Sequence, residues 1–225
     1  MTRLTCLITC LATCLFLVSC ATPTRPVSCP EGRQQLPGCP PLGAVDDPEV
    51  NRVYERRTWV PSSDISGDLI ERAKQVSIPV QHARTRFLGP DAHGAIDSLA
   101  VKLWMIENAE HTIDFTYYIF TNDLVGYSML AAMCNAVRRG VDVRVTIDSM
   151  GSASGGAHPA LRALATCGEQ AGFMRDSEGR LTTRKARVQV VIFNAVTKFS
   201  NPNRRSHDKL LVKDGNFEEK SAVIT

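Results

Sequence analysis

The sequence predicts an α/β fold with a largely parallel central sheet flanked by helices. Between residues 96 and 193 of the 225-residue chain, apolar residues recur alternately at helical and at strand spacing. Helix-end signals separate the two kinds of segment, as where Arg138-Arg139 precedes Gly140. A repeated order of strand and helix favours parallel strands joined by helical crossovers.

The first predicted helix follows Gly94, where apolar residues recur every three or four positions. A strand over residues 112–120 comes next, because apolar and polar residues alternate there. Asn122 or Asp123 then caps a second helix, which we expect to end at Gly140.

The second part of the predicted sheet begins with a strand over residues 141–148. A glycine- and serine-rich loop, a helix over 159–167, a polar connection and a buried strand over 187–193 follow. Sites in such sheets collect at the carboxyl ends of the strands. Asp148 ends a strand beside the flexible loop, so it either lines a pocket or caps the loop, and the sequence leaves both open.

The first 19 residues predict an export signal. Arg3 precedes an apolar run, residues 4–18, that is too short to span a bilayer, which requires about 20 apolar residues. The end of this segment, Leu17-Val18-Ser19-Cys20, resembles a bacterial lipoprotein box, which implies lipid on Cys20. An ordinary signal peptide cut nearby is the alternative. Ala21 after the cysteine favours the periplasmic face of the outer membrane, with the inner membrane as second choice.

Residues 20–79 are rich in proline and poor in large apolar side chains. Such a segment buries too little to order itself, so we expect a tether, with one short helix near residues 64–75. The folded domain is expected to occupy residues 80–225.

Four cysteines remain outside the leader and the lipidation position. Cys29 and Cys39 lie in the proline-rich segment and could close a small disulfide in an oxidising compartment. Cys134 and Cys167 fall on predicted helices and are interpreted as buried core thiols.

Composition excludes few functions. A formal net charge of +3 is too small to indicate a nucleic-acid partner, although it is compatible with an anionic lipid surface. No cysteine or histidine spacing indicates a zinc site. We therefore expect neither a metal nor another cofactor.

The most informative stretch lies near the C-terminus, where His207, Lys209 and Asp214 have the spacing H-x-K-x-x-x-x-D. On a strand, His207 and Lys209 point to the same face. A neutral imidazole can attack phosphorus, and an ammonium beside it can stabilise charge on the phosphate oxygens. The alternative is an edge strand with solvated polar side chains, so the motif needs support from its context.

The motif resembles the HKD signature of the phospholipase D superfamily. The preceding Asn203-Arg204-Arg205-Ser206 resembles the approach to the motif in bacterial cardiolipin synthase-like members. Residues 108–118 and 139–148 resemble two elements of a phospholipase D half-domain. The resemblance implies a phospholipase D-like half-domain. Arg205, beside the motif, and Asp148, at its strand end, are the candidate substrate-binding residues.

The resemblance implies a role for each residue of the motif. His207 would be the nucleophile that becomes a phosphohistidine, Lys209 would bind phosphate, and Asp214 would be mainly a structural hydrogen-bonding residue. A histidine from a second HKD motif would protonate the leaving group. The implied reaction is that of a phosphodiesterase or phosphatidyltransferase acting on phospholipids.

The chain departs from the family pattern at its end. The family carries an element such as Gly-Gly-x-Asn after the motif and often a second HKD motif, whereas this chain stops at Thr225. We therefore expect the N-terminal half of a two-motif lipid enzyme, held at the membrane by a lipid anchor. The alternatives are a single-motif homodimeric phosphodiesterase or nuclease, and an inactive truncated remnant; a nucleic-acid partner is not favoured.

Overall fold

The fold of the chain is seen in a computed structural model. The structure describes residues 29, 38–58, 83–152, 157–194, 205–217 and 219–225. The chain divides into two compact units, residues 1–39 and residues 40–225. In the first unit, Cys29 and Cys39 form a disulfide.

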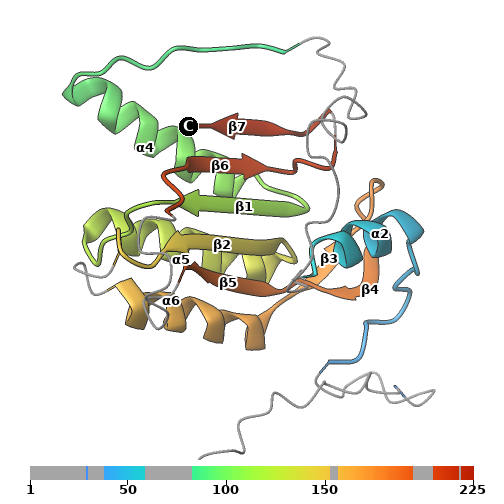
Figure 1. The fold of residues 1–225 in the computed structure, drawn as a ribbon. Coiled ribbons are helices and arrows are strands. Elements are labelled where there is room, and N and C mark those ends of the chain that lie inside the picture. The colour runs from blue at the N-terminus through green and yellow to red at the C-terminus, as the bar shows by residue number, and fades with distance from the viewer. Residues whose placement is uncertain (1–28, 30–37, 59–82, 153–156, 195–204, 218) are drawn as a thin grey trace, which may run out of the picture. The chain divides into compact units, whose positions relative to one another are not determined.

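The second unit is built on a five-stranded sheet of order β5-β2-β1-β6-β7 (Figure 1). Its strands are β1 (Thr112–Tyr117), β2 (Asp142–Asp148), β5 (Val188–Phe193), β6 (Lys209–Lys213) and β7 (Ala222–Ile224). β2 is parallel to both β1 and β5, and β6 is antiparallel to both β1 and β7. All strands except β6 thus share one direction, which confirms the α/β fold with a largely parallel sheet.

The predicted helices form. They are α4 (Ala92–Glu107), α5 (Leu124–Arg139) and α6 (Ala157–Thr166), followed by the short 3-10 helix η1 (Cys167–Gln170). Helix α5 has its predicted caps, and α4 begins two residues before Gly94, at Ala92, with Asp91 as its N-cap. Asp123, rather than Asn122, caps α5 by accepting the backbone N–H of Gly126 at 2.8 Å. Gly140 ends α5 with φ of 100°, and a Cβ there would lie 2.1 Å from the carbonyl oxygen of Phe173.

The core lies between the sheet and the helices α4, α5 and α6, which pack against one another and against the strands (Figure 1). Alternate strand residues point into it, as the predicted period requires. The most deeply buried members include Ile106, Ile113, Met133, Val137, Val143, Val145, Ile147, Leu161 and Leu211. No helix in the described part of the chain is long and apolar enough to cross a membrane.

Helix α2 (Pro48–Arg56) corrects the tether interpretation of residues 20–79, which is wrong for this segment. Asp47 caps the helix, and Pro48 suits its first turn. Val50 and Val53 lie on one face and are each 1% exposed. Proline content concealed this short amphipathic pattern. The expected helix over residues 64–75 lies outside the described residues.

A β-hairpin occupies most of the region expected to be a polar connection. It consists of β3 (Phe173–Arg175) and β4 (Leu181–Lys185), which pair antiparallel. Asp176 organises the turn by accepting the N–H groups of Glu178 and Arg180 at 3.0 and 2.8 Å. Short strands separated by charged residues carry a weak periodic signal, which explains why the sequence analysis missed them.

Cys134 and Cys167 form a second disulfide, so their interpretation as core thiols is wrong. The bond joins α5 to the start of η1 across a sequence separation of 33 residues. In the chain-entropy model, a loop of this length gives about 3–4 kcal/mol of stabilisation.

We expect the double variant Cys134→Ala/Cys167→Ala to lower the free energy of unfolding by about this amount in urea titrations. An unchanged value would show that the bond adds no stability.

Candidate active site

The side chains of His207 and Lys209 meet at the start of β6. The Lys209 Nζ lies 3.4 Å from the His207 Nδ1 and donates to the His207 carbonyl oxygen at 3.3 Å. Both side chains are exposed. Strand alternation therefore produces the expected pair of an imidazole and an ammonium, open to a ligand.

Tyr118 is a further residue at this position that the sequence analysis did not identify as part of the site. Its ring centroid lies 4.5 Å from that of His207, and its backbone N–H donates to the Asp208 carbonyl oxygen at 3.0 Å. Tyr118 follows directly after β1, so its place at a strand end was a usable signal. It packs against the imidazole and limits its orientation.

Asp148 and Arg205 come together beside the motif. The Arg205 Nη1 lies 3.6 Å from the Asp148 Oδ1, and the Ser206 N–H donates to Oδ2 at 3.3 Å. Asp148 also accepts the N–H groups of Met150 and Gly151 at 2.9 and 3.1 Å. Because Asp148 is only 1% exposed, this geometry matches the loop-capping alternative, with the added role of holding the segment that leads to His207.

The loop after β2 is tied to the end of β1. Ser152 accepts the Phe120 N–H at 3.0 Å and donates to the Tyr118 carbonyl oxygen at 3.2 Å. A Cβ on Gly151 would lie 2.2 Å from that same carbonyl oxygen, so only glycine allows this approach. The loop thus fixes the backbone that carries the Tyr118 ring.

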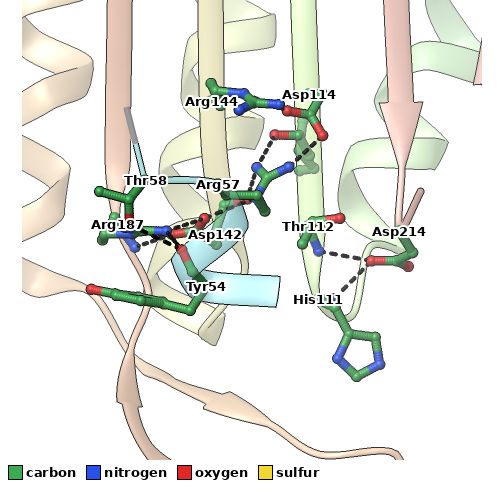
Figure 2. Close-up of polar contacts among 11 residues, drawn as sticks. Tyr54, Arg57, Thr58, His111, Thr112, Asp114, Asp142, Arg144, Arg187 and Asp214 are labelled. Atoms are coloured by element: carbon green, nitrogen blue, oxygen red, sulfur yellow. Dashed lines mark hydrogen bonds and ion pairs between the residues drawn. The ribbon is translucent and has the colours of Figure 1, made fainter. Parts of the chain in front are cut away.

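Asp214 lies at the other end of β6, away from His207. Its carboxylate accepts the N–H groups of His111 and Thr112 at 2.7 and 2.9 Å (Figure 2). It also accepts the Glu110 N–H at 3.1 Å and the Lys213 ammonium at 2.9 Å. Seven positions at about 3.3 Å each separate it from His207 by roughly 20 Å. The structure does not bring Asp214 to the candidate nucleophile, and its contacts are those of a structural residue.

Burial and hydrogen bonding act in opposite directions on Asp214. Burial alone raises the pKa of the carboxyl, but hydrogen bonds from Thr112, Lys213, His111 and Glu110 outweigh it and hold the pKa below its ordinary value. The contribution of Asp214 to stability is therefore present above about pH 4 and is lost as the pH falls through the lowered pKa.

His111 is fully buried next to Asp214. Its ring stacks on Phe217 at 3.9 Å, and its Nδ1 lies 3.1 Å from the Arg175 carbonyl oxygen. Burial lowers the pKa of His111 and outweighs the opposing effect of Asp214, while Lys220 lowers it further. The folded chain therefore binds a proton here less readily than the unfolded chain.

We expect the free energy of unfolding to fall as the pH drops below about 6.5, because protonation of His111 then favours the unfolded chain. Urea titrations at pH 7.5 and 5.5 measure this effect, which for one group is at most about 1.4 kcal/mol over that interval. In His111→Gln the difference between the two pH values should shrink. An unchanged difference in the variant would assign the effect to other groups.

A cluster of buried charges lies at the amino ends of β1 and β2 (Figure 2). Arg57, which follows α2, pairs with Asp114 of β1 and with Asp142 of β2, the latter at 3.0 Å. Arg187 also pairs with Asp142 at 3.0 Å, and Arg144 pairs with Asp114 at 2.8 Å. Asp142 begins β2 and Asp148 ends it, so this cluster stands at the opposite end of the sheet from His207 and is structural.

The described residues offer the site a nucleophile and positive charge. Within this part of the chain, no group of three or more His, Cys, Asp or Glu side chains is placed to hold a metal ion. The imidazole of His207 can attack an electrophilic centre, and the ammonium of Lys209 can hold an anion beside it. This combination fits the attack of a histidine on a phosphate ester.

Comparison with known families supports that chemistry. The model of a family described as "Cardiolipin synthase, PLD-like domain" matches residues 103–224, which is more than half of the chain. The chain belongs to the phospholipase D superfamily. The superfamily resemblance of the HKD motif is thereby confirmed.

Cardiolipin synthase C of Escherichia coli (strain K12) is 30% identical over 132 residues. The match covers 54% of this chain but 24% of that relative, so the chain spans about a quarter of its length. Among solved structures, Nuc from Salmonella typhimurium, a phospholipase D family member, is similar at 20% identity and a TM-score of 0.35. That alignment covers 56% of this chain and 60% of Nuc.

Proposed function

We propose that this phospholipase D-like chain supplies one half of an active site that cleaves or transfers the phosphodiester of a phospholipid through a phosphohistidine at His207. The observation that carries the proposal is the exposed pair of His207 and Lys209, whose nitrogens lie 3.4 Å apart. The similarity to cardiolipin synthase C favours a phospholipid over other phosphodiesters.

The reaction has two displacements. A ring nitrogen of His207 attacks phosphorus, the bond from phosphorus to the first alcohol breaks, and that alcohol leaves with a proton from a partner histidine. Water or a second alcohol then gives its proton to the partner histidine and displaces the nitrogen. Water as acceptor makes the enzyme a phospholipase D, and phosphatidylglycerol as acceptor makes it a cardiolipin synthase, whereas glycerol as acceptor gives phosphatidylglycerol.

The partner histidine is assigned to a second HKD motif, either in a second half of the protein or in a second copy of the chain. The sequence contains a single H-x-K-x-x-x-x-D motif, and His207 is exposed rather than enclosed by its own unit. Light scattering on the purified chain distinguishes the two sources, because a homodimeric site requires a dimer at the assay concentration.

A substrate with a good leaving group tests the nucleophile without the partner. Bis(p-nitrophenyl) phosphate releases p-nitrophenolate without protonation, so His207 and Lys209 should suffice for one displacement. We expect a burst of p-nitrophenolate, a matching mass adduct on His207, and no effect of EDTA. Phosphatidylglycerol vesicles then test the natural reaction when a second motif is supplied. The absence of both burst and adduct would identify an inactive remnant.

Lys209→Gln should slow the burst by about a hundredfold or more, because the ammonium stabilises the charge that develops on the phosphate oxygens. Lys185→Gln, which removes the same charge from β4, is the control and should leave the rate unchanged. Equal rates in wild type and Lys209→Gln would exclude the phosphate-binding role.

Export and lipidation at Cys20 form part of the proposal, with the periplasmic face of the outer membrane as the site of action. Residues 1–28 lie outside the described part of the chain. The two disulfides support an oxidising compartment. Mass spectrometry of the exported protein tests it, since an unmodified N-terminus other than Cys20 would contradict lipidation.

A further inference from the structure

An apolar pocket of about 390 Å³ lies between the first turns of α4, the first turns of α5 and the end of β1. Its size falls within the range of small-molecule sites, about 300–1,000 Å³. The lining is mostly apolar and includes Ile96, Leu99, Phe115, Phe120 and Met129. The chemistry proposed above does not use this pocket.

The mouth of the pocket is unusually apolar for a protein surface. Ile96, Ile119 and Val125 line it and are 66%, 52% and 48% exposed. Exposed apolar side chains that gather around a concave site indicate an apolar ligand rather than water.

Two polar groups lie within this apolar lining. The Tyr117 hydroxyl is buried and has no hydrogen-bond partner among the described residues. The Lys102 Nζ lies 5.5 Å from the centroid of the Tyr117 ring. The other polar lining residues are engaged, since Thr121 donates to Asp123 and Asp123 caps α5. A buried hydroxyl without a partner is costly, so a ligand with an acceptor oxygen fits here.

The pocket lining and the candidate active site are neighbours at the end of β1. Tyr117 is directly opposite Lys209 in the antiparallel pairing of β1 with β6, and such pairs project to the same face of the sheet. The next residue, Tyr118, packs against the His207 ring. A ligand that carries both a phosphate and an apolar tail suits this arrangement.

We propose that this pocket holds one acyl chain of the phospholipid substrate, with Tyr117 and Lys102 donating to the ester carbonyl oxygen. The proposal rests on the proposed function, which places the phosphate at His207 and Lys209. It adds a recognition element within this chain that selects for the lipid tail rather than for the head group.

Binding of alkyl monophosphates of 6, 8 and 10 carbons, kept below their micelle concentrations, tests the pocket by calorimetry. Because these compounds are phosphomonoesters, the measurement reports binding and does not require cleavage of a phosphodiester. We expect Kd to fall by about fourfold for each additional buried methylene. Ala95→Phe, an exposed α4 residue of the lining, should abolish this dependence on chain length. Ile96→Asp should do the same by charging the mouth.

Val223→Phe is the matched control, because it adds the same ring to an exposed position of β7. Its chain-length dependence should equal that of wild type. Equal dependence in wild type and Ala95→Phe, or no binding at any chain length, would overturn the pocket assignment. A third outcome separates the two proposals: Ala95→Phe removes the dependence on chain length, but Lys209→Gln leaves the affinity unchanged. That outcome would support the pocket and overturn the proposed phosphate site.

The ester contact has a separate test. Tyr117→Phe should weaken binding of a 1-acyl glycerol phosphate by about tenfold and leave its 1-alkyl ether analogue unaffected, because the ether lacks the carbonyl acceptor. Equal effects on both ligands would remove Tyr117 from the ester contact.

Discussion

His207→Ala is expected to lower the rate of phosphodiester cleavage by a factor on the order of 10⁵–10⁶, the usual cost of removing a covalent nucleophile. Alanine removes the nitrogen that would form the bond to phosphorus. Among the described residues, His207 is the imidazole that contacts Lys209. The burst with bis(p-nitrophenyl) phosphate and the steady-state rate on phospholipid should both be lost.

His93→Ala provides the matched control for that variant. His93 is an exposed residue of α4, so its removal should leave both rates unchanged. Thermal unfolding should show the same midpoint for His207→Ala and wild type, because His207 is exposed. Full activity in His207→Ala would sink the nucleophile assignment.

The sequence predicted those parts of the fold that local patterns encode. The strands β1 and β2 and the helix α5 follow from alternation, from Asp123 as N-cap and from Gly140 as helix end, because each of these signals acts within a few residues. The hairpin of β3 and β4 was missed because its strands are short and polar.

The sequence predicted the reactive side chains of the candidate site, but not the contacts that hold them in place. His207 and Lys209 meet because alternation puts them on one face. The pairing of Asp148 with Arg205 joins residues 57 positions apart in the sequence and depends on how β2 lies beside the segment before β6. Spacing alone does not encode such a contact, and it could not show that Asp148 is buried.

Helix α2 shows most clearly what the sequence concealed. Composition marks residues 20–79 as a tether, yet Arg57 lies at the end of a helix and is 3% exposed. It donates to the carbonyl oxygens of Ile113 and Asp142 at 3.0 Å each. An arginine is ordinarily a surface residue, so only the three-dimensional pairing with Asp114 and Asp142 reveals this role.

Arg57→Met should lower the free energy of unfolding by about 3–5 kcal/mol, because it keeps much of the side-chain volume but leaves a buried carboxylate without one of its partners. Asp142 is 0% exposed and would retain Arg187 alone, while Asp114 would retain Arg144. Urea titration measures the change.

A variant on the exposed face of α2 is the control, because it distinguishes loss of the buried ion pairs from loss of helix stability. Arg52 pairs with Glu49 on the surface of the same helix, so Arg52→Met should cost less than about 1 kcal/mol. Asp114→Asn should partly offset Arg57→Met, since it removes one of the carboxylates left behind. A loss of similar size in Arg52→Met and Arg57→Met would mean that α2 contributes through its helix alone. A large loss of unfolding free energy in Arg57→Met only, which Asp114→Asn reduces in the double variant, would show that the ion pairs of Arg57 hold α2 against the sheet.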